Sequence, residues 1–342
     1  MEPHAAAGAE ARPRVFSGMQ PTSSLHIGNY IGALKHWVAG QDERDNVFCV
    51  VDLHALTIPE AVDPAELRAR SRSVAALYLA AGIDPERSVV FVQSHVPEHA
   101  EASWLFNCVA PLGWLQRMTQ FKSKAHGRES VGSGLLTYPA LMAADILLHD
   151  TDEVPVGEDQ MQHVELTRDL AIRFHHLFGE VFVLPRAVVP PAGARVMGFD
   201  DPEAKMSKST AEAGRPGHAV LLTDPPDAVR KTIMSAVTDS GRELRFEHAS
   251  PGVRNLLTVW QALDGRPMPD IEAEVAGRGY GDLKKRVVEV VVEALAPIRA
   301  RYGELMGDPA ELDALLARGA ERARETAART LARMRAAVGV GA

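Results

Sequence analysis

The sequence of 342 residues is poor in cysteine. Its two cysteines, Cys49 and Cys108, form no CxxC pattern, and each lies in an apolar run, VFCVV and LFNCVA. This placement argues against a disulfide framework and against a cysteine-based zinc site. We therefore expect both thiols to be reduced and buried in the core.

Long apolar segments are also missing. The first residues, MEPHAAAGAEARPR, are small and polar and carry charges of both signs, which is unlike a signal peptide. No window approaches the about 18 consecutive apolar residues that a membrane span needs. The pattern predicts a cytoplasmic protein with a disordered tail at residues 1–13 and no membrane partner.

The chain has no excess of positive charge. Its 37 basic and 45 acidic side chains give a formal net charge of −8. Proteins that coat nucleic acid are usually basic, so DNA is not an expected partner. RNA should bind only through restricted basic surfaces, such as residues 281–342 with a net charge of +2. Only eight basic residues are lysines, so the close pairs Lys122/Lys124 and Lys205/Lys208 suggest lysine chemistry.

Strands and helices alternate over the first 210 residues. The runs NVFCVV (46–51) and SVVFVQ (88–93) are typical of strands buried on both faces. Such alternation predicts right-handed crossovers and an α/β, doubly wound parallel sheet. Further strands are expected at 14–18, 154–157, 181–184 and 195–199. Helices are expected at 27–38, 64–81, 98–110, 112–121, 136–149 and 158–178.

The character of the chain changes after about residue 210. Strand-like runs stop, and helical patterns dominate at 226–236, 253–263, 283–306 and 310–338. The stretch AEAGRPGH (211–218), with two glycines and a proline, is typical of a linker. We therefore expect a catalytic α/β domain over 14–210 and an all-α domain over 211–342. The Ala- and Arg-rich end of the chain is typical of a solvated helix.

The first motif is His26-Ile27-Gly28-Asn29, between the end of a strand and the start of a helix. Free N–H groups and the positive end of the helix dipole can bind phosphate there. Gly28 has no Cβ, so a nucleoside can approach the backbone, and His26 can donate to a phosphate oxygen. Taken alone, the motif fits an ordinary turn with a surface histidine better.

The second motif is Lys205-Met206-Ser207-Lys208-Ser209. Its lysines and serines provide mobile cationic and hydroxyl donors that can follow a phosphate as charge develops. The alternative is a solvated loop. A given five-residue string arises by chance in such a chain with odds on the order of 10⁻⁴, which favours the functional interpretation.

Together, HIGN and KMSKS resemble the two signatures of class I aminoacyl-tRNA synthetases. Five further stretches resemble the bacterial tryptophanyl-tRNA synthetases, and the similarity runs from about residue 14 to the C-terminus. They are FSGMQPT (16–22), VDLHALT (51–57), RMTQFK (117–122), GLLTYPALMAADILL (134–148) and VPVGEDQ (154–160).

The resemblance implies a Rossmann-like catalytic domain that activates L-tryptophan with ATP and transfers it to the terminal adenosine of tRNA(Trp). It also implies a homodimer and a helical domain that contacts the anticodon. No editing domain is expected, because the size of tryptophan and its indole N–H already permit strong discrimination.

A tryptophan pocket needs apolar walls and one fixed acceptor, because indole has one donor and no acceptor. Asp145 lies in the apolar run ALMAADILL, where a carboxylate costs free energy unless it has a partner. The resemblance assigns it to the indole N–H, and the alternative is a structural Asp bonded to backbone. Met142, at i−3, can wall the same face. The other candidates for this pocket are Phe16, Val154 and Val156 as walls, and Gln160, Tyr138 and His54 as polar contacts. For His54, a core histidine with satisfied hydrogen bonds is a comparable alternative.

The resemblance also implies the ATP contacts. They are Gln20, Pro21 and Thr22 under the nucleotide, Gly28 and Asn29 at the adenosine, Gly157, Glu158 and Asp159 at the ribose, the backbone of Val196 at the adenine, and Lys205, Met206, Ser207, Lys208 and Ser209 at the phosphates. Lys205, Lys208, Lys124 and His26 are the candidate catalytic residues. Lys124, at the edge of a loop expected over 123–134, should reach pyrophosphate, although a solvated loop is an equal alternative. Mg²⁺ should arrive with ATP, without a dedicated protein site.

Three alternatives remain from the sequence. A tyrosyl-tRNA synthetase of the same fold is the nearest, since an Asp can also accept from a phenol. A nucleotidylyltransferase shares an HxGH-type turn but would ignore amino acids. A synthetase-like binding or regulatory module without ligase activity is the third, and the intact lysine pair Lys205/Lys208 argues against it.

Overall fold

The computed structural model describes residues 12–22, 24–157, 160–189, 195–207 and 217–341. Residues 1–11 of the predicted tail and most of the predicted linker lie outside these ranges, as do four candidate site residues, Glu158, Asp159, Lys208 and Ser209. Among the described residues, no helix is both long and apolar enough to cross a membrane.

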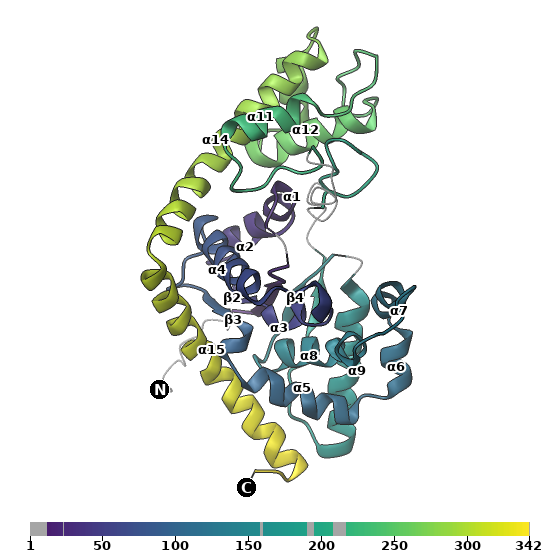
Figure 1. Cartoon of the computed structure of the whole chain (residues 1–342), viewed down its shortest axis with the longest axis vertical. Helices are drawn as coiled ribbons and strands as arrows, with labels where there is room; N and C mark the ends of the chain where they lie inside the picture. Colours follow the sequence, from purple (N-terminus) through teal and green to yellow (C-terminus); the bar gives the residue numbers. More distant parts are fainter. Residues whose placement is uncertain (1–11, 23, 158–159, 190–194, 208–216, 342) are drawn as a thin grey trace, which may run out of the picture.

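A five-stranded, entirely parallel sheet forms the centre of the α/β part (Figure 1). The strand order is β3-β2-β1-β4-β5. The strands are β1 (Arg14–Met19), β2 (Asp45–Val50), β3 (Val89–Val92), β4 (Glu153–Pro155) and β5 (Arg186–Val188). The Rossmann-like prediction is confirmed. The chain builds β1 to β3 on one side and then crosses to β4 and β5 on the other, so its order reverses between β1 and β4.

Two of the strand predictions differ from the structure. Residues 181–184 form no strand, because Phe182 packs its ring on Phe106 and Phe174 and donates its backbone N–H to Nε2 of His175. The fifth strand begins after this segment instead. Residues 195–199 contribute only an isolated bridge, between Met197 and Lys205.

The sheet is buried on both faces, as its apolar runs predict. Along β2, Phe48 and Val50 pack into one hydrophobic cluster, while Val47 and Cys49 pack into the cluster on the opposite face. This alternation follows from the period of two residues in a strand. Cys49 is buried as expected, but the prediction for Cys108 is wrong, because its side chain is exposed on α5.

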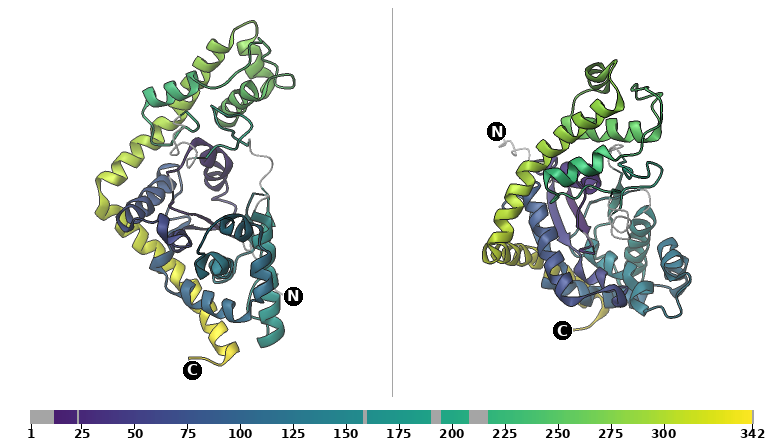
Figure 2. Two further views of the ribbon diagram at one scale, coloured as in Figure 1. Left: turned by 45° about the vertical axis from the view of Figure 1, so that its right-hand side comes forward. Right: turned by 45° about the horizontal axis from the view of Figure 1, so that its top comes forward.

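Helices cover both faces of the sheet (Figure 2). They and the short helical turns are α1 (Ile27–Asn29), the π-helical η1 (Tyr30–Leu34), α2 (Lys35–Ala39), α3 (Asp52–Ala55), η2 (Pro59–Ala61), α4 (Pro64–Ala80), η3 (Gln93–His95), α5 (Glu98–Val109), α6 (Leu112–Arg117), α7 (Thr119–Ala125), α8 (Ser133–Leu147) and α9 (Met161–Phe178). The helix expected over 112–121 breaks at Met118, whose backbone is extended. Lys122 and Lys124 consequently lie in the last turn of α7, directly before a loop over residues 126–132.

The chain is helical again beyond residue 225. The helices are α11 (Pro226–Met234), α12 (Pro251–Asp264), α13 (Met268–Val275), α14 (Tyr280–Gly307) and α15 (Pro309–Val338). Helices α11 to α14 pack on one another, and their apolar residues are continuous with one face of the sheet. Figure 1 shows α14 and α15 along one side of the whole molecule.

Helix α15 is not a solvated helix. Its small residues Ala320, Ala323 and Ala327 are buried in the cluster that includes β3 and α5. Four of its arginines contact the α/β part: Arg322 donates to the carbonyl of Pro85, Arg324 to the carbonyl of His95, Arg333 pairs with Asp150, and Arg335 pairs with Glu101. Much of the positive charge near the C-terminus therefore stabilises the chain's own fold and is not free for RNA.

Gly319 permits the closest approach of α15 to the sheet. A Cβ at this position would lie 1.8 Å from the carbonyl oxygen of Val90, which is far inside van der Waals contact. We expect Gly319→Ala to lower the free energy of unfolding by about 2–4 kcal/mol. The control is Gly303→Ala, at an exposed position of α14 where no neighbouring atom lies within 4 Å of such a Cβ. It should raise the free energy of unfolding by about 0.5–1 kcal/mol. Urea unfolding of both variants measures this, and an unaffected Gly319→Ala variant would contradict the packing.

Candidate active site

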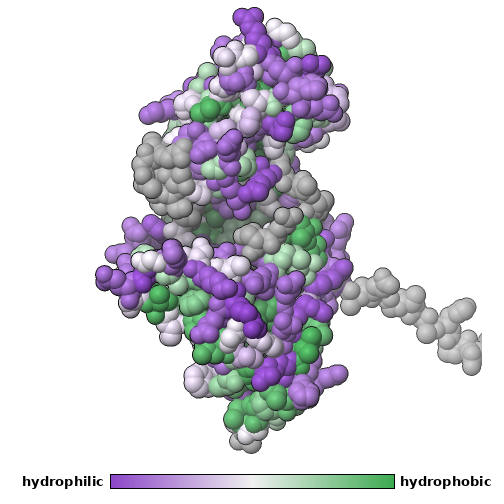
Figure 3. Space-filling model, turned by 90° about the vertical axis from the view of Figure 1, so that its right-hand side faces the viewer, coloured by the Kyte–Doolittle hydropathy of each residue, from purple (hydrophilic) through white to green (hydrophobic). Residues whose placement is uncertain are grey.

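A cavity of about 480 Å³ opens at the carboxyl ends of the central strands. Ser17, Gly18 and Met19 of β1 form part of its wall, and Val154 and Pro155 of β4 form another part. It therefore lies where the strand order reverses, which is the position at which open parallel sheets bind ligands. Figure 3 shows the molecule hollowed at mid-height, between its upper helical part and its lower part.

All eight residues predicted for a tryptophan pocket line this cavity. They are Phe16, His54, Tyr138, Met142, Asp145, Val154, Val156 and Gln160. Three residues predicted for ATP or pyrophosphate, Gln20, Gly157 and Lys124, line it as well. The sequence therefore predicted a set of side chains that the fold does bring together, from segments as far apart as β1 and α9.

Several lining residues were missed. Trp37, Gln120 and His163 line the same cavity. His163 lies three residues after Gln160 and so on the same face of α9, a spacing that the sequence offered as a signal. Trp37 stacks on Phe48 with a centroid distance of 4.7 Å, so its position depends on the packing of the sheet, which no motif around Trp37 indicates.

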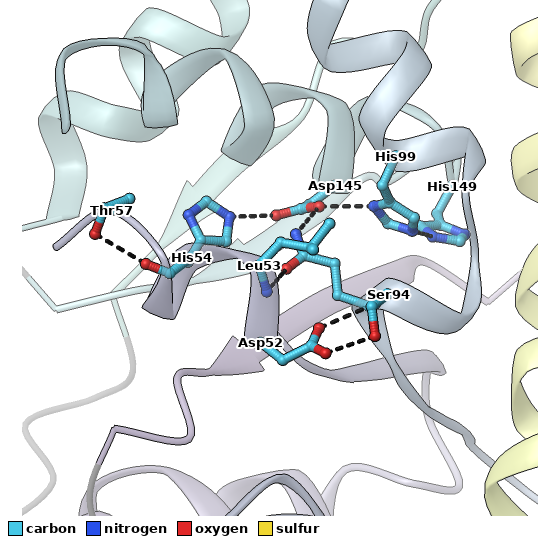
Figure 4. Close-up of polar contacts among 9 residues, drawn as sticks. Asp52, Leu53, His54, Thr57, Ser94, His99, Asp145 and His149 are labelled. Atoms are coloured by element: carbon cyan, nitrogen blue, oxygen red, sulfur yellow. Dashed lines mark hydrogen bonds and ion pairs between the residues drawn. The ribbon is translucent and has the colours of Figure 1, made fainter. Parts of the chain in front are cut away.

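Asp145 is the most strongly bonded side chain of the site (Figure 4). Its Oδ2 lies 2.7 Å from Nε2 of His54, and its Oδ1 accepts from Nε2 of Gln93 at 2.6 Å and lies 2.6 Å from Nδ1 of His99. The side chain is only 1% exposed. The alternative of a structural Asp bonded to backbone is therefore wrong, because its partners in the protein are three side chains. The assignment of Asp145 to an indole N–H stays a prediction.

The ionisation of Asp145 follows from these contacts. Burial alone would raise the pKa of its carboxyl group, but the hydrogen bonds and charges of His54 and His99 outweigh burial and hold that pKa well below its usual range. The cavity thus presents a carboxylate that stays ionised at neutral pH and can only accept hydrogen bonds.

Other polar groups in the wall are partly desolvated. The hydroxyl of Tyr138 lies 2.6 Å from Nε2 of His163, and burial raises the pKa of Tyr138 to about 12, so it remains a neutral phenol. Nζ of Lys124 lies 5.8 Å from the centroid of the Tyr138 ring, within the range of a cation–π contact. Burial lowers the pKa of Lys124. This lysine reaches the cavity from α7.

A second group of predicted residues lies around α1. A Cβ on Gly28 would meet the ring of His26 at 3.0 Å and the side chain of Val196 at 3.6 Å, so the lack of a side chain keeps this surface open. The segment of Lys205 is fixed beside Val196, because the N–H of Met206 donates to the carbonyl of Val196 at 3.2 Å. The predicted ATP residues Gly28, Val196, Lys205 and Met206 are thus neighbours.

The turn at His26 differs from its prediction in one respect. The backbone N–H of Ile27 donates to the carbonyl of Val220 at 2.9 Å and is not free for a phosphate. Within the described part of the chain, Nδ1 of His26 is buried without a hydrogen-bond partner. A polar atom in this state costs free energy, and an oxygen ligand that satisfied it would lower that cost. The other residues predicted for ATP, Pro21, Thr22, Asn29 and Ser207, lie outside the wall of the cavity.

His26 makes stability depend on pH. Burial, with smaller effects of Lys205 and His218, lowers the pKa of His26 to about 4. The unfolded chain takes up this proton near pH 6.5, so its contribution to stability is complete above that pH and is lost as the pH falls toward 4. Between pH 7 and pH 5 the loss should be about 2 kcal/mol. We expect a His26→Thr variant to lose about 2 kcal/mol less than the parent over this interval in urea unfolding. Equal losses in both proteins would show that His26 is not held neutral.

Comparison with known proteins agrees with this architecture. Residues 9–296 match the family model of class I tRNA synthetases for tryptophan and tyrosine. The chain therefore belongs to the class I aminoacyl-tRNA synthetases, and it is an enzyme of that class.

Similar sequences specify the family further. The chain is 54% identical to a tryptophan–tRNA ligase of Leifsonia xyli subsp. xyli, covering 96% of this chain and 97% of that protein. It is 51% identical to the tryptophan–tRNA ligase of Bacillus subtilis, over 96% and 98%. Tryptophanyl-tRNA synthetase of Campylobacter jejuni, solved with ADP and tryptophan, superposes with a TM-score of 0.83 at 36% identity, over 96% of this chain and 100% of that chain. Within its class, the chain belongs to the bacterial tryptophan–tRNA ligases.

Proposed function

We propose that this chain ligates L-tryptophan to tRNA(Trp) in two steps. An oxygen of the tryptophan carboxylate bonds to the α-phosphorus of ATP as the bond to pyrophosphate breaks, which gives tryptophanyl-adenylate. The 2′-hydroxyl of the terminal adenosine then attacks the acyl carbon, and AMP leaves. One observation carries this proposal. The cavity lies where the strand order reverses, and all eight residues predicted for a tryptophan pocket line its wall.

The indole is proposed to lie against Asp145. Phe16, Met142 and the valines of β4 offer apolar surface for the ring, and the carboxylate offers the acceptor for the one N–H of indole. A hydrogen bond to an ionised acceptor in a buried site is worth more than one between neutral groups. We propose that Gln160, Tyr138 and His54 bind or orient the remaining polar groups of the amino acid.

The nucleotide is proposed to lie across α1 and the Val196–Lys205 segment. Gln20, Pro21 and Thr22 would form its floor, Gly28 and Asn29 would meet adenosine, and the backbone of Val196 would meet adenine. Gly157, Glu158 and Asp159 would accept from the ribose hydroxyls. The neighbouring positions of His26, Gly28 and Val196 support this arrangement, as does the ADP in the Campylobacter jejuni relative.

The phosphates are proposed to be bound by cations from two sides. Lys205, Met206, Ser207, Lys208 and Ser209 would supply one side and Lys124, from α7, the other, where it would reach pyrophosphate. His26 would donate to a phosphate oxygen. Mg²⁺ is expected to arrive with ATP and to be bound by phosphates and water. Because phosphoryl-type transfer depends mostly on positioning and charge stabilisation, these cations would carry most of the rate enhancement.

Tyrosine is the closest competing amino acid. A tyrosyl enzyme would also need an acceptor, but the relatives with about half of their residues identical are tryptophan–tRNA ligases. We propose that helices α11 to α14, within the region 211–342, contact the anticodon of tRNA(Trp), and that the protein works in the cytoplasm, where charged tRNA is used. Charging of a tRNA(Trp) transcript with radiolabelled tryptophan tests the proposed function. Charging with tyrosine but not tryptophan would refute it.

We also propose a homodimer, formed through α5 and α6. Trp104 is 67% exposed and Leu112 is 58% exposed, and large exposed apolar side chains of this kind mark protein interfaces. We expect Trp104→Glu to convert a particle of twice the chain mass into a monomer in size-exclusion chromatography with light scattering. Val340→Glu, which changes another exposed apolar residue, should leave the mass unchanged. A Trp104→Glu variant that remains a dimer would show that α5 and α6 do not form the interface.

A further inference from the structure

A line of buried hydrogen bonds leads from the cavity into the core behind it (Figure 4). Nδ1 of His99, on α5, contacts Asp145, and Nε2 of the same ring lies 3.3 Å from Nε2 of His149. The side chains of His99 and His149 are 0% and 1% exposed, and neither belongs to the cavity wall. They do not line the cavity, so any influence they have on a ligand there passes through neighbouring residues such as Asp145.

The hydrogen bonds to Asp145 leave a single open position. Each carboxylate oxygen can accept about two hydrogen bonds. Among the described residues, Oδ1 is saturated by Gln93 and His99, whereas Oδ2 is bound by His54 alone. One acceptor position therefore remains on Oδ2, and both Asp145 and His54 line the cavity. A ligand with one N–H donor matches this vacancy.

The groups on Oδ1 are themselves fixed. Oε1 of Gln93 accepts the backbone N–H of Leu53 at 3.1 Å, so the amide must direct its NH₂ at Asp145. Nδ1 of His99 must carry a proton, because an ionised carboxylate only accepts. Its Nε2 lies 3.3 Å from Nε2 of His149, so the two rings are joined by one hydrogen bond. Burial lowers the pKa of His149 well below its usual range, so His149 is neutral and has one proton to donate.

Aromatic packing holds both imidazoles in position. The His149 ring stacks on Phe16, with centroids 5.6 Å apart and planes 12° apart, and Phe91 packs on His99 at 5.7 Å. Phe16 also lines the cavity. The orientation of the Asp145 carboxylate therefore depends on residues from β1, β3 and α5 that are remote from Asp145 in sequence.

We propose that His99 is a positioning residue for tryptophan recognition. Together with Gln93 it saturates Oδ1 of Asp145 and leaves Oδ2 as the one acceptor for the indole N–H, while His149 fixes the tautomer of His99. This inference rests on the proposed function, and it adds a determinant of specificity that does not contact the substrate.

The test compares tryptophan with 3-(benzothiophen-3-yl)alanine, in which sulfur replaces the indole N–H. ATP–pyrophosphate exchange is measured with both amino acids for the parent protein, His99→Leu and His99→Asn. The parent should prefer tryptophan by about tenfold or more in kcat/KM. His99→Leu should lower this preference by about tenfold, through KM for tryptophan, and should leave the analogue within about threefold. His99→Asn retains an N–H near the position of Nδ1 and should restore most of the preference.

Other outcomes are distinguishable. An unchanged preference in His99→Leu, or an equal loss for both amino acids, would overturn the inference while the proposed function stands. A parent protein without any preference would refute the contact between Asp145 and indole and, with it, this inference. If His99→Leu does not fold, the His149→Phe variant tests the inference instead. This variant retains the ring stacking on Phe16 but removes the hydrogen bond to His99. It should lower the preference by about threefold, and an unchanged value would count against the network.

Discussion

Replacing Asp145 by asparagine should lower kcat/KM for tryptophan by about 10²-fold in ATP–pyrophosphate exchange. The amide has one acceptor oxygen in place of two, while His54, Gln93 and His99 all approach this group. At least one of them would face the NH₂ group of the amide. Both the open acceptor for indole and the charge that strengthens it are lost.

Stability should fall in the same variant. Breaking a fully buried hydrogen-bonded network leaves donors unpaired, which costs about 1–3 kcal/mol for each group. Met142→Leu is the matched control, because it changes the same cavity at nearly constant volume and should cost less than about 1.5 kcal/mol. An Asp145→Asn protein with kcat/KM within about threefold of the parent would contradict the assigned role of this carboxylate.

Replacing Lys205 and Lys208 together by alanine should slow the formation of tryptophanyl-adenylate by at least about 10³-fold. Removal of one charge-stabilising donor costs about 10²–10³ in rate in comparable sites, and here two cations would be lost. Lys205 lies beside Val196 and His26 and away from the wall of the tryptophan cavity. Binding of tryptophan should therefore change by less than about twofold.

Single-turnover formation of the adenylate and equilibrium binding of tryptophan separate these effects. The control is Lys231→Ala, which removes an exposed lysine on α11 and should leave both measurements unchanged. A double variant with the rate of the parent would refute the catalytic role of the pair. A variant that lost tryptophan binding would instead indicate a structural role.

The sheet could be predicted because its signal is local. A run such as NVFCVV is apolar at every position, which only a strand covered on both faces can bury. The run VFVL (181–184) has the same composition, yet its Phe182 serves as a packing residue between two helices. Composition does not distinguish these two uses, because the difference lies in which backbone groups find partners.

The wall of the cavity was predictable for another reason. Residues such as Asp145 and Gln160 stand in motifs whose similarity to a known family covers their neighbours as well. The residues that orient Asp145 were missed, because Gln93 and His99 lie 52 and 46 positions away and approach only after the sheet has formed. Their sequence signal is weak, since a lone buried histidine or glutamine resembles many core residues.

The buried face of helix α15 was not recognised in the sequence because it contains many small residues. Its contact surface consists largely of Ala320, Ala323, Ala327 and Gly319, which contribute little to a hydrophobic pattern. Between them, arginines dominate the sequence and suggest exposure. The same arginines pair with acidic groups and carbonyls of the α/β part, so the charge pattern describes an internal contact.

Amino-acid-dependent ATP–pyrophosphate exchange by the purified full-length chain tests the central claim most directly. Each of the 20 amino acids is offered separately with ATP, Mg²⁺ and labelled pyrophosphate. We expect exchange with tryptophan and at least about 10³-fold weaker kcat/KM with tyrosine, because a site built around one buried acceptor discriminates strongly by binding. Exchange with tyrosine and not tryptophan, or no exchange with any amino acid, would contradict the account.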